Sequence, residues 1–250
     1  SRFFNLPLIV YENNMVLGRA NKYLSSFSKK ILVARQINEK FPEKYRKKTY
    51  EVGTILNKDI INFSPFEKNN EKNNFSILVI GGSQGAEVFG QVIPQVIKMI
   101  KETGQEIVIQ QQCNQNQINS LVNFYTENHI NNYVFGFEKN IMKLALSSDL
   151  AITRCGASTT AELVHTFTPF IAVPLPNSID NHQHLNAKYY EEKGCCWVLE
   201  QGEFNTKNLF DLVMKTIKDK NKLEDVKKNM KKNCNKDVYQ NIENKIKEFI

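Results

Sequence analysis

Short runs of consecutive apolar residues recur along the chain, with polar and helical stretches between them. Eight runs have the length of a β-strand: residues 8–11, 31–34, 77–80, 107–110, 133–135, 150–153, 170–173 and 197–199. They are apolar rather than alternating, as is typical of strands that are covered on both faces of a sheet. Helical periodicity separates them, for example over residues 117–128 and 141–147. The pattern predicts an α/β fold built on a doubly wound parallel sheet.

The composition of the chain narrows the classes of protein to which it belongs. Its net charge is +7, and much of the excess lies in the lysine-rich stretch 215–247, which we interpret as a solvated helical face. An acidic membrane surface is the alternative partner; nucleic acid is disfavoured because no aromatic residues interleave with the lysines. No apolar run approaches the roughly 20 residues that span a bilayer. Five cysteines, Cys113, Cys155, Cys195, Cys196 and Cys234, fit no zinc or disulfide pattern and indicate a reducing cytosol.

A glycine-rich turn, GGSQG, follows the predicted strand at 77–80. Ligands of open α/β sheets bind at the carboxyl ends of strands, and glycine lets the backbone approach a ligand closely. Backbone N–H groups here and at the start of the next helix would then donate to a phosphate. The turn lacks the Lys-Ser/Thr of a P-loop, and Ser83 replaces the second glycine of the dinucleotide fingerprint. A plain strand-to-helix turn without a ligand is the alternative.

A second turn of the same kind lies in TRCGASTTAE, residues 153–162. Ser158, Thr159 and Thr160 open the predicted helix, where hydroxyl and backbone N–H groups together suit an anion. Glu162 follows in the first helical turn, and a carboxylate there suits the hydroxyl groups of a sugar. Thr159 and Glu162 also have the spacing of a capping box, which would give them a purely structural role. Both interpretations stay open on this stretch alone.

A proline-flanked loop and a helix follow in VPLPNSIDNHQHLNAKYY, residues 173–190. Asp180 is predicted to begin the helix, with Gln183 three positions later, which is again the spacing of a capping box. His182 and His184 do not share a helix face and have no apparent third ligand, so no metal site is expected. Uncharged Asn, His and Gln side chains suit the hydroxyl groups of a neutral sugar.

These segments occur in an order and at a spacing that resemble the MurG family of glycosyltransferases. The likeness is carried by ILVIGGSQGAEVFGQVIPQV, SSDLAITRCGASTTAELV and DNHQHLNAKYYEEKGCCWVL, and by LPLIVYENNMVLGRANKYL nearer the start. It implies the GT-B fold, with a complete C-terminal Rossmann-like parallel-sheet domain after the end of an N-terminal Rossmann-like domain. The expected division is 1–57 for the acceptor-side remnant, 58–74 for a linker, 75–230 for the UDP-sugar-binding domain and 231–250 for a basic C-terminal helix.

The resemblance also implies which residues bind the donor UDP-GlcNAc. The residues that match positions beside its pyrophosphate are Gly82, Ser83, Gln84, Ala157, Ser158, Thr159, Thr160 and Ala161. Glu162 matches the carboxylate that holds the ribose hydroxyls, and Gln183 matches a glutamine on the GlcNAc hydroxyls. Glu138 matches a position whose backbone reads the uracil edge. Asn14 matches an asparagine of the first domain that faces the cleft.

Several positions depart from the family pattern. Asn57 replaces an arginine that is expected to bind phosphate, which would remove a bidentate charged contact. Tyr11 stands where the family has a histidine, and His182 where it often has a glutamine. The glycine-rich first loop of the family, which carries a candidate catalytic base, would lie upstream of Ser1, so we expect that an upstream piece is missing. No catalytic residue is named for this reason.

The activity implied is transfer of GlcNAc from UDP-GlcNAc to lipid I, a lipid-linked muramyl acceptor, in peptidoglycan synthesis. The reaction would invert the anomeric carbon without metal or cofactor, since helix dipoles and hydroxyl groups can stabilise the departing UDP. The expected location is the cytoplasmic face of the bacterial inner membrane, on its anionic surface, with no nucleic acid as partner. The alternatives are a related GT-B transferase with another acceptor, and a UDP-sugar-binding fragment or split-enzyme chain. An NAD-dependent enzyme is disfavoured because the dinucleotide glycines are absent.

Overall fold

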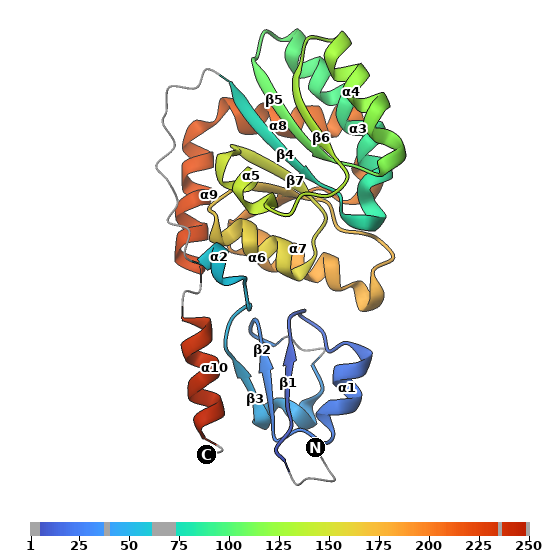
Figure 1. Cartoon of the computed structure of the whole chain (residues 1–250). Coiled ribbons are helices and arrows are strands. Elements are labelled where there is room, and N and C mark those ends of the chain that lie inside the picture. Colours follow the sequence, from blue (N-terminus) through green and yellow to red (C-terminus); the bar gives the residue numbers. More distant parts are fainter. Residues whose placement is uncertain (1–5, 38–40, 62–73, 235–236, 249–250) are drawn as a thin grey trace.

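Two parallel β-sheets form the framework of the molecule (Figure 1). The computed structural model describes residues 6–37, 41–61, 74–234 and 237–248, with only the backbone of residues 58–59 and 83–86. Most of the predicted linker at 58–74 therefore lies outside the described residues. The smaller sheet has the order β1-β2-β3 and the larger one has the order β6-β5-β4-β7-β8-β9. Every pairing is parallel, which confirms the predicted fold class.

The strands agree closely with the apolar runs of the sequence. They are β1 (Ile9–Glu12), β2 (Lys30–Val33), β3 (Thr49–Glu51), β4 (Phe75–Ile80), β5 (Ile107–Gln112), β6 (Asn131–Phe135), β7 (Leu150–Thr153), β8 (Phe170–Ala172) and β9 (Cys196–Val198). All eight predicted strands are present, with ends shifted by at most two residues. Strand β3 was not predicted, because its sequence TYE is short and mostly polar and its side chains are half-buried or exposed.

Helices cover both faces of the larger sheet, and α1 (Arg19–Ser25) and α10 (Val238–Lys247) flank the smaller one (Figure 1). The other helices are α2 (Lys58–Ile61), α3 (Gly82–Glu102), α4 (Ile118–Glu127), α5 (Ile141–Ser147), α6 (Ala157–His165), α7 (His182–Glu192), α8 (Thr206–Lys218) and α9 (Lys220–Asn233). Along β4, Ile77 and Val79 belong to one apolar core, and Leu78 and Ile80 belong to the other. A strand whose two faces are both buried accounts for the unbroken apolar run.

The smaller sheet packs on its own core and is reached by the end of the chain. Ile31 and Val33 of β2 pack against Phe41 and Tyr45. Helix α10 returns to this sheet, where Lys30 forms an ion pair with Glu248 just beyond that helix (Figure 1). The last helix is thus packed against the first sheet.

The topology brings the two glycine turns of the sequence together. Strands β4 and β7 are neighbours in the sheet, and Ile80 pairs with Thr153 at their carboxyl ends. The N–H group of Arg154 donates to the carbonyl of Ile80 across this edge, at 3.2 Å. The turns that contain Gly81 and Gly156 therefore leave the sheet side by side, which is where open α/β sheets bind ligands.

Candidate functional site

The first residue of α3, Gly82, is exposed to solvent. Gly82 has a φ of 61°, a left-handed conformation that favours glycine, and a Cβ added there would meet nothing within 4 Å. Its N–H group donates to Oε1 of Gln112 at 3.2 Å, so strand β5 fixes the turn. Ser83 and Gln84 lie in this first helical turn. Their backbone belongs to the start of α3, and their side chains lie outside the described residues.

The first turn of α6 presents uncapped backbone N–H groups. The N-cap is Gly156, which has no side chain to cap the helix, and Ala157 is the first helical residue. The hydroxyl of Thr160 donates back to the carbonyls of Gly156 and Ala157, at 3.0 and 3.2 Å. The first N–H groups of any α-helix lack an intrahelical acceptor, so those of Ala157, Ser158 and Thr159 are donors of the kind that bind anions.

The capping-box alternative for Thr159 and Glu162 is wrong. Thr159 is the third residue of α6 rather than its N-cap, so it cannot receive the reciprocal bonds of that motif. The Glu162 carboxylate makes no hydrogen bond or ion pair with any residue that the structure describes. Burial raises the pKa of Glu162 above its usual value. An unpaired, half-buried carboxylate beside Ser158, on the same helix face, is typical of a group that binds a ligand.

Gln183 joins the end of β7 to the loop that follows β8. Its Oε1 accepts from the N–H groups of Cys155 and Leu175, each at 3.1 Å. The side-chain oxygen is therefore fixed by two backbone donors. The Nε2 group has no hydrogen-bond partner among the described residues, and it remains available as a donor to a ligand hydroxyl.

The start of α7 differs from the prediction. Asp180 and Asn181 have φ values of 51° and 58°, and the helix begins at His182. Residues in the left-handed region cannot continue a right-handed helix, so the prediction that Asp180 begins and caps this helix was wrong. The N-cap is Asn181, whose side chain makes no capping bond, and the N–H group of Gln183 donates to Oγ of Ser178 at 3.2 Å.

The two histidines of this segment have other partners. Nδ1 of His182 lies 2.7 Å from the carbonyl of Ile179, and Nδ1 of His184 lies 2.9 Å from a carboxylate oxygen of Glu200. The described part of the chain holds no group of three side chains able to bind a metal.

Glu138 lies in the loop after β6, further along the same edge of the sheet. Its carboxylate accepts from the N–H group of Asn140 at 2.8 Å and from the hydroxyl of Tyr133 at 3.0 Å. These two bonds, in that order, lower the pKa of Glu138. The side chain thus holds the backbone of its own loop, and the neighbouring Phe137 is 83% exposed. The Glu138 side chain is therefore occupied within its own loop.

Asn14 faces its own loop rather than the larger sheet. Its N–H and Nδ2 groups donate to Glu12, whose buried carboxylate also accepts from Gly18 and Asn21. The preceding residue, Asn13, reaches across, and its Nδ2 donates to Oγ of Ser158 at 3.1 Å. The first-domain loop therefore contacts α6 through Asn13, which the sequence did not single out.

Two arginines near the site were also missed. The guanidinium of Arg154 donates to the carbonyl of Val173 at 3.1 Å and to Oε1 of Gln201 at 2.7 Å, and it lies over the ring of Phe89. Arg35 extends from the smaller sheet to the carbonyl of Ala157 at 3.0 Å. Each follows a predicted strand directly, and a charged residue in that position is the signal that was available.

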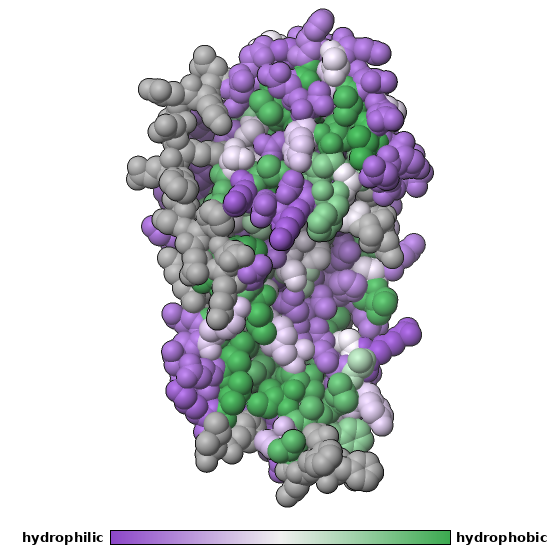
Figure 2. All heavy atoms as spheres, in the orientation of Figure 1, coloured by the Kyte–Doolittle hydropathy of each residue, from purple (hydrophilic) through white to green (hydrophobic). Residues whose placement is uncertain are grey.

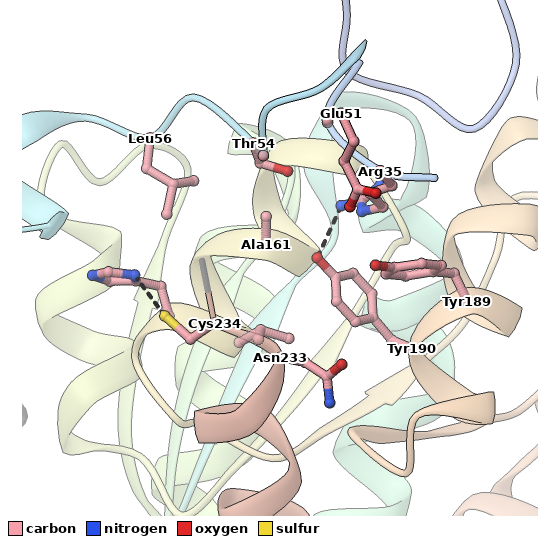
Figure 3. Close-up of a pocket in the computed structure, with 13 residues that line it drawn as sticks. Arg35, Glu51, Thr54, Leu56, Ala161, Tyr189, Tyr190, Asn233 and Cys234 are labelled. Atoms are coloured by element: carbon pink, nitrogen blue, oxygen red, sulfur yellow. Dashed lines mark hydrogen bonds between the residues drawn. The ribbon is translucent and has the colours of Figure 1, made fainter. Parts of the chain in front are cut away.

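Arg35 lines a small pocket between the two sheets, shown in Figure 3. The pocket has a volume of about 70 Å³. Thr54 and Leu56 line it from the smaller sheet's side, Ala161 from α6 and Tyr190 from α7. It is too small for a nucleotide sugar. It lies where α6 and α7 meet the smaller sheet.

Comparisons with known proteins agree with this arrangement. Residues 76–242 match the family described as the glycosyltransferase family 28 C-terminal domain. A Pelagibacter ubique protein is 36% identical over 247 residues, which cover 98% of this chain and 68% of the relative. A Rickettsia bellii protein is 32% identical and is covered over 70% of its length. Both relatives are named UDP-N-acetylglucosamine–N-acetylmuramyl-(pentapeptide) pyrophosphoryl-undecaprenol N-acetylglucosamine transferase.

One solved structure shares the fold over almost the whole chain. The crystal structure of Acinetobacter baumannii MurG superposes with a TM-score of 0.80 at 23% sequence identity. The superposition covers 99% of this chain and 69% of that one. Both sheets therefore have counterparts in that structure.

Proposed function

The chain belongs to glycosyltransferase family 28 and, within it, to the MurG transferases, and from this we propose that it transfers GlcNAc from UDP-GlcNAc to lipid I. The product would be lipid II of the peptidoglycan pathway. The names of the two relatives give both the donor sugar and a lipid-linked muramyl acceptor. The proposal takes that donor and that acceptor for this chain.

The observation that carries the proposal is the start of α6 beside the start of α3. Uncapped N–H groups at Ala157, Ser158 and Thr159 suit the diphosphate of UDP. Gly82 leaves room for that diphosphate at the adjacent strand end, where the backbone of Ser83 and Gln84 begins α3. Two helix N-termini on one anion would stabilise the charge that develops as UDP departs.

The other parts of the donor are assigned to the remaining polar groups. The free carboxylate of Glu162 would accept hydrogen bonds from the ribose hydroxyls. Nε2 of Gln183 would donate to a hydroxyl of GlcNAc, because its oxygen is already held by two backbone donors. The backbone at Glu138 would read the uracil edge from the loop after β6. Thr160 and Ala161 would contribute through the helix itself, and Asn14 through the loop it holds with Glu12.

The chemical step requires a nucleophile and a leaving group on opposite faces of the sugar. The acceptor hydroxyl would form a bond to the anomeric carbon while the bond to the UDP oxygen breaks, which inverts that carbon. The hydroxyl proton passes to a base, and the electron pair of the broken bond stays on UDP. In this chain the helix termini serve the leaving group. No residue of the chain is assigned as the base.

The setting of the reaction is also part of the proposal. A lipid-linked acceptor implies work at the cytoplasmic face of the inner membrane, where anionic lipids attract lysine-rich surfaces. Helices α9 and α10 carry many of the lysines of the stretch 215–247. Among the described residues, no helix has both the length and the apolar character to cross a membrane.

Two measurements on the chain test the proposal. Isothermal titration with UDP-GlcNAc, UDP and GDP should give binding of the two uridine nucleotides and none of GDP. A turnover assay with a lipid I analogue should then release UDP and form the disaccharide. A chain that binds neither uridine nucleotide contradicts the proposal, and transfer to a different glycoside would point to a related acceptor.

A second candidate is a UDP-sugar-binding chain that does not transfer the sugar by itself, as in a split enzyme. No residue of this chain is assigned as the base, and the chain spans 68% of the Pelagibacter ubique relative. Binding of UDP-GlcNAc without turnover, followed by turnover when the remaining third of such a relative is added, would support this candidate.

A further inference from the structure

Arg35 follows a strand of the smaller sheet, but its guanidinium donates its hydrogen bonds to residues of α6 and α7, which cover the larger sheet. It follows β2 by two residues and is 5% exposed. Its Nη2 donates to the carbonyl of Ala157 and to the hydroxyl of Tyr190, both at 3.0 Å, and its Nη1 donates to Oδ1 of Asn186 at 3.1 Å. Figure 3 shows the guanidinium beside Tyr190 at the boundary between the two parts. All three acceptors lie on α6 or α7.

The positive charge of Arg35 has no carboxylate partner within ion-pair distance among the described residues. Glu51 lines the same pocket but forms no ion pair with it, and the carboxylate of Glu12 is occupied by its own loop. The Nε of Arg35 is buried without a hydrogen-bond partner. The rings of Tyr189 and Tyr190 lie within 5.4 and 4.8 Å and offset only part of the cost of burying a cation.

The charge also lies against the positive end of a helix dipole. Ala157, whose carbonyl accepts from Arg35, is the first residue of α6. A cation beside a helix N-terminus is electrostatically unfavourable while the site is empty. An anion bound to the N–H groups of that turn would be attracted both by the Arg35 guanidinium and by the N-terminus of α6. It would thereby offset the repulsion between these two positive groups.

We propose that Arg35 is a positioning residue of the donor site, which fixes the first turn of α6 and supplies the positive charge that a nucleoside diphosphate requires. The inference rests on the proposed function, because it takes the start of α6 as the diphosphate site. It also offers a reason why this chain tolerates Asn57 where the family resemblance leads one to expect a phosphate-binding arginine. In this chain the proposed cation lies on the loop after β2 rather than at position 57.

The competing explanation is that Arg35 only holds the geometry of the first turn of α6, as a strut with no electrostatic role. Comparing the binding of uridine, which has no phosphate, with that of UDP separates this explanation from the proposal. A strut would affect uridine and UDP alike, since loss of the turn's geometry would disturb Glu162 as well. A charge would affect UDP alone. The neutral variant Arg35→Gln keeps an amide donor for the contacts, and Arg35→Lys keeps the charge but not the planar fork.

The experiment measures the affinity of the whole chain for UDP and uridine by titration, with the melting temperature recorded for each variant. We expect Arg35→Gln to lower the affinity for UDP about tenfold or more and the affinity for uridine by less than about twofold. Arg35→Lys should retain most of the UDP affinity. The double variant Arg35→Gln, Asn57→Arg should recover part of the lost UDP affinity. Lys30→Met removes a cation from the far end of the same strand and should leave both affinities unchanged.

Equal weakening of uridine and UDP in Arg35→Gln would overturn the inference in favour of a strut. A Lys variant as weak as the Gln variant for UDP would overturn its electrostatic part. Unchanged UDP affinity in Arg35→Gln would overturn the inference while leaving the proposed function intact. A wild-type chain that binds no UDP would instead remove the proposed function on which it rests.

Discussion

The two sheets of the molecule satisfy their polar groups in different ways. The six-stranded unit holds the carboxyl edge of its sheet with its own residues, such as buried Arg154 and Asn186 and half-buried Gln183. The three-stranded part sends Asn13 and Arg35 outward to α6 and α7. The proposed donor site is therefore formed mainly by residues of the larger sheet's unit, and Asn13 and Arg35 contact it from the smaller sheet.

The surfaces of the two parts also differ in how much apolar area they expose. Figure 2 shows apolar side chains gathered over the lower part of the molecule, whereas the upper part is mostly polar on this face. Leu6, Tyr23 and Phe27 of the smaller part are 63%, 70% and 47% exposed. A unit with its own two cores needs little from its neighbour, while a three-stranded sheet leaves apolar area uncovered. The comparison predicts that substitutions in the larger unit have the greater effects.

The largest effect is expected at Arg154. Arg154→Met would leave the buried carbonyl of Val173 and Oε1 of half-buried Gln201 without their donor and remove the contact with Phe89, costing roughly 2–4 kcal/mol of unfolding free energy. Urea unfolding measures it. Lys228→Met, which removes only an exposed pair with Asp225, should stay within about 0.5 kcal/mol. If Arg154→Met lowered the free energy of unfolding as little as this control does, the stability of the larger unit would not depend on the hydrogen bonds of Arg154.

The next effect concerns the free carboxylate of α6. Glu162→Gln should weaken both uridine and UDP by roughly 1.5–3 kcal/mol, because the hydrogen bonds from ribose would go to a neutral amide. Titration calorimetry measures it, and Thr166→Ser, in the same helical region and facing Thr168, serves as the control. If the variant bound uridine as tightly as wild type, the assignment of ribose to Glu162 would be wrong.

A smaller and more selective effect is expected at Gln183. Gln183→Glu keeps an oxygen for the N–H groups of Cys155 and Leu175 but replaces the free Nε2 donor, so UDP-GlcNAc should weaken by about 1 kcal/mol while UDP changes little. Gln183→Ala would instead leave those two N–H groups unpaired and lower the melting temperature. Equal loss of both nucleotides in the Glu variant would exclude a role toward the sugar.

The smallest effect is a pH dependence of stability. Burial raises the pKa of Glu162 in the folded state above its unfolded value, so the contribution of this group to stability is full below the unfolded pKa and is lost as pH rises through the folded one. Glu162→Gln should therefore unfold at a higher temperature than wild type near neutral pH and at the same temperature near pH 4. A variant less stable than wild type at neutral pH would mean that the carboxylate has a stabilising partner.

The positions of eight strands could be predicted from the sequence because buried parallel strands have unbroken apolar runs, whereas their order in the sheets was not predicted. Strand β3 was not, since TYE lies at the edge of a small sheet and its side chains are not fully buried. At the site, both glycine turns were found where local composition marks them. The pairings that cross between sheets, Asn13 with Ser158 and Arg35 with Ala157, join residues more than 100 positions apart and leave no local pattern. The start of α7 was misplaced because a capping-box spacing does not reveal left-handed backbone at Asp180.

Amide hydrogen exchange with and without saturating UDP tests most directly whether the starts of α3 and α6 hold one diphosphate. The account predicts slower exchange in UDP for the backbone N–H groups of residues 82–86 and of residues 157–159 together, with little change at the pocket around Thr54. Slowing at only one of the two turns, or at neither, would contradict it.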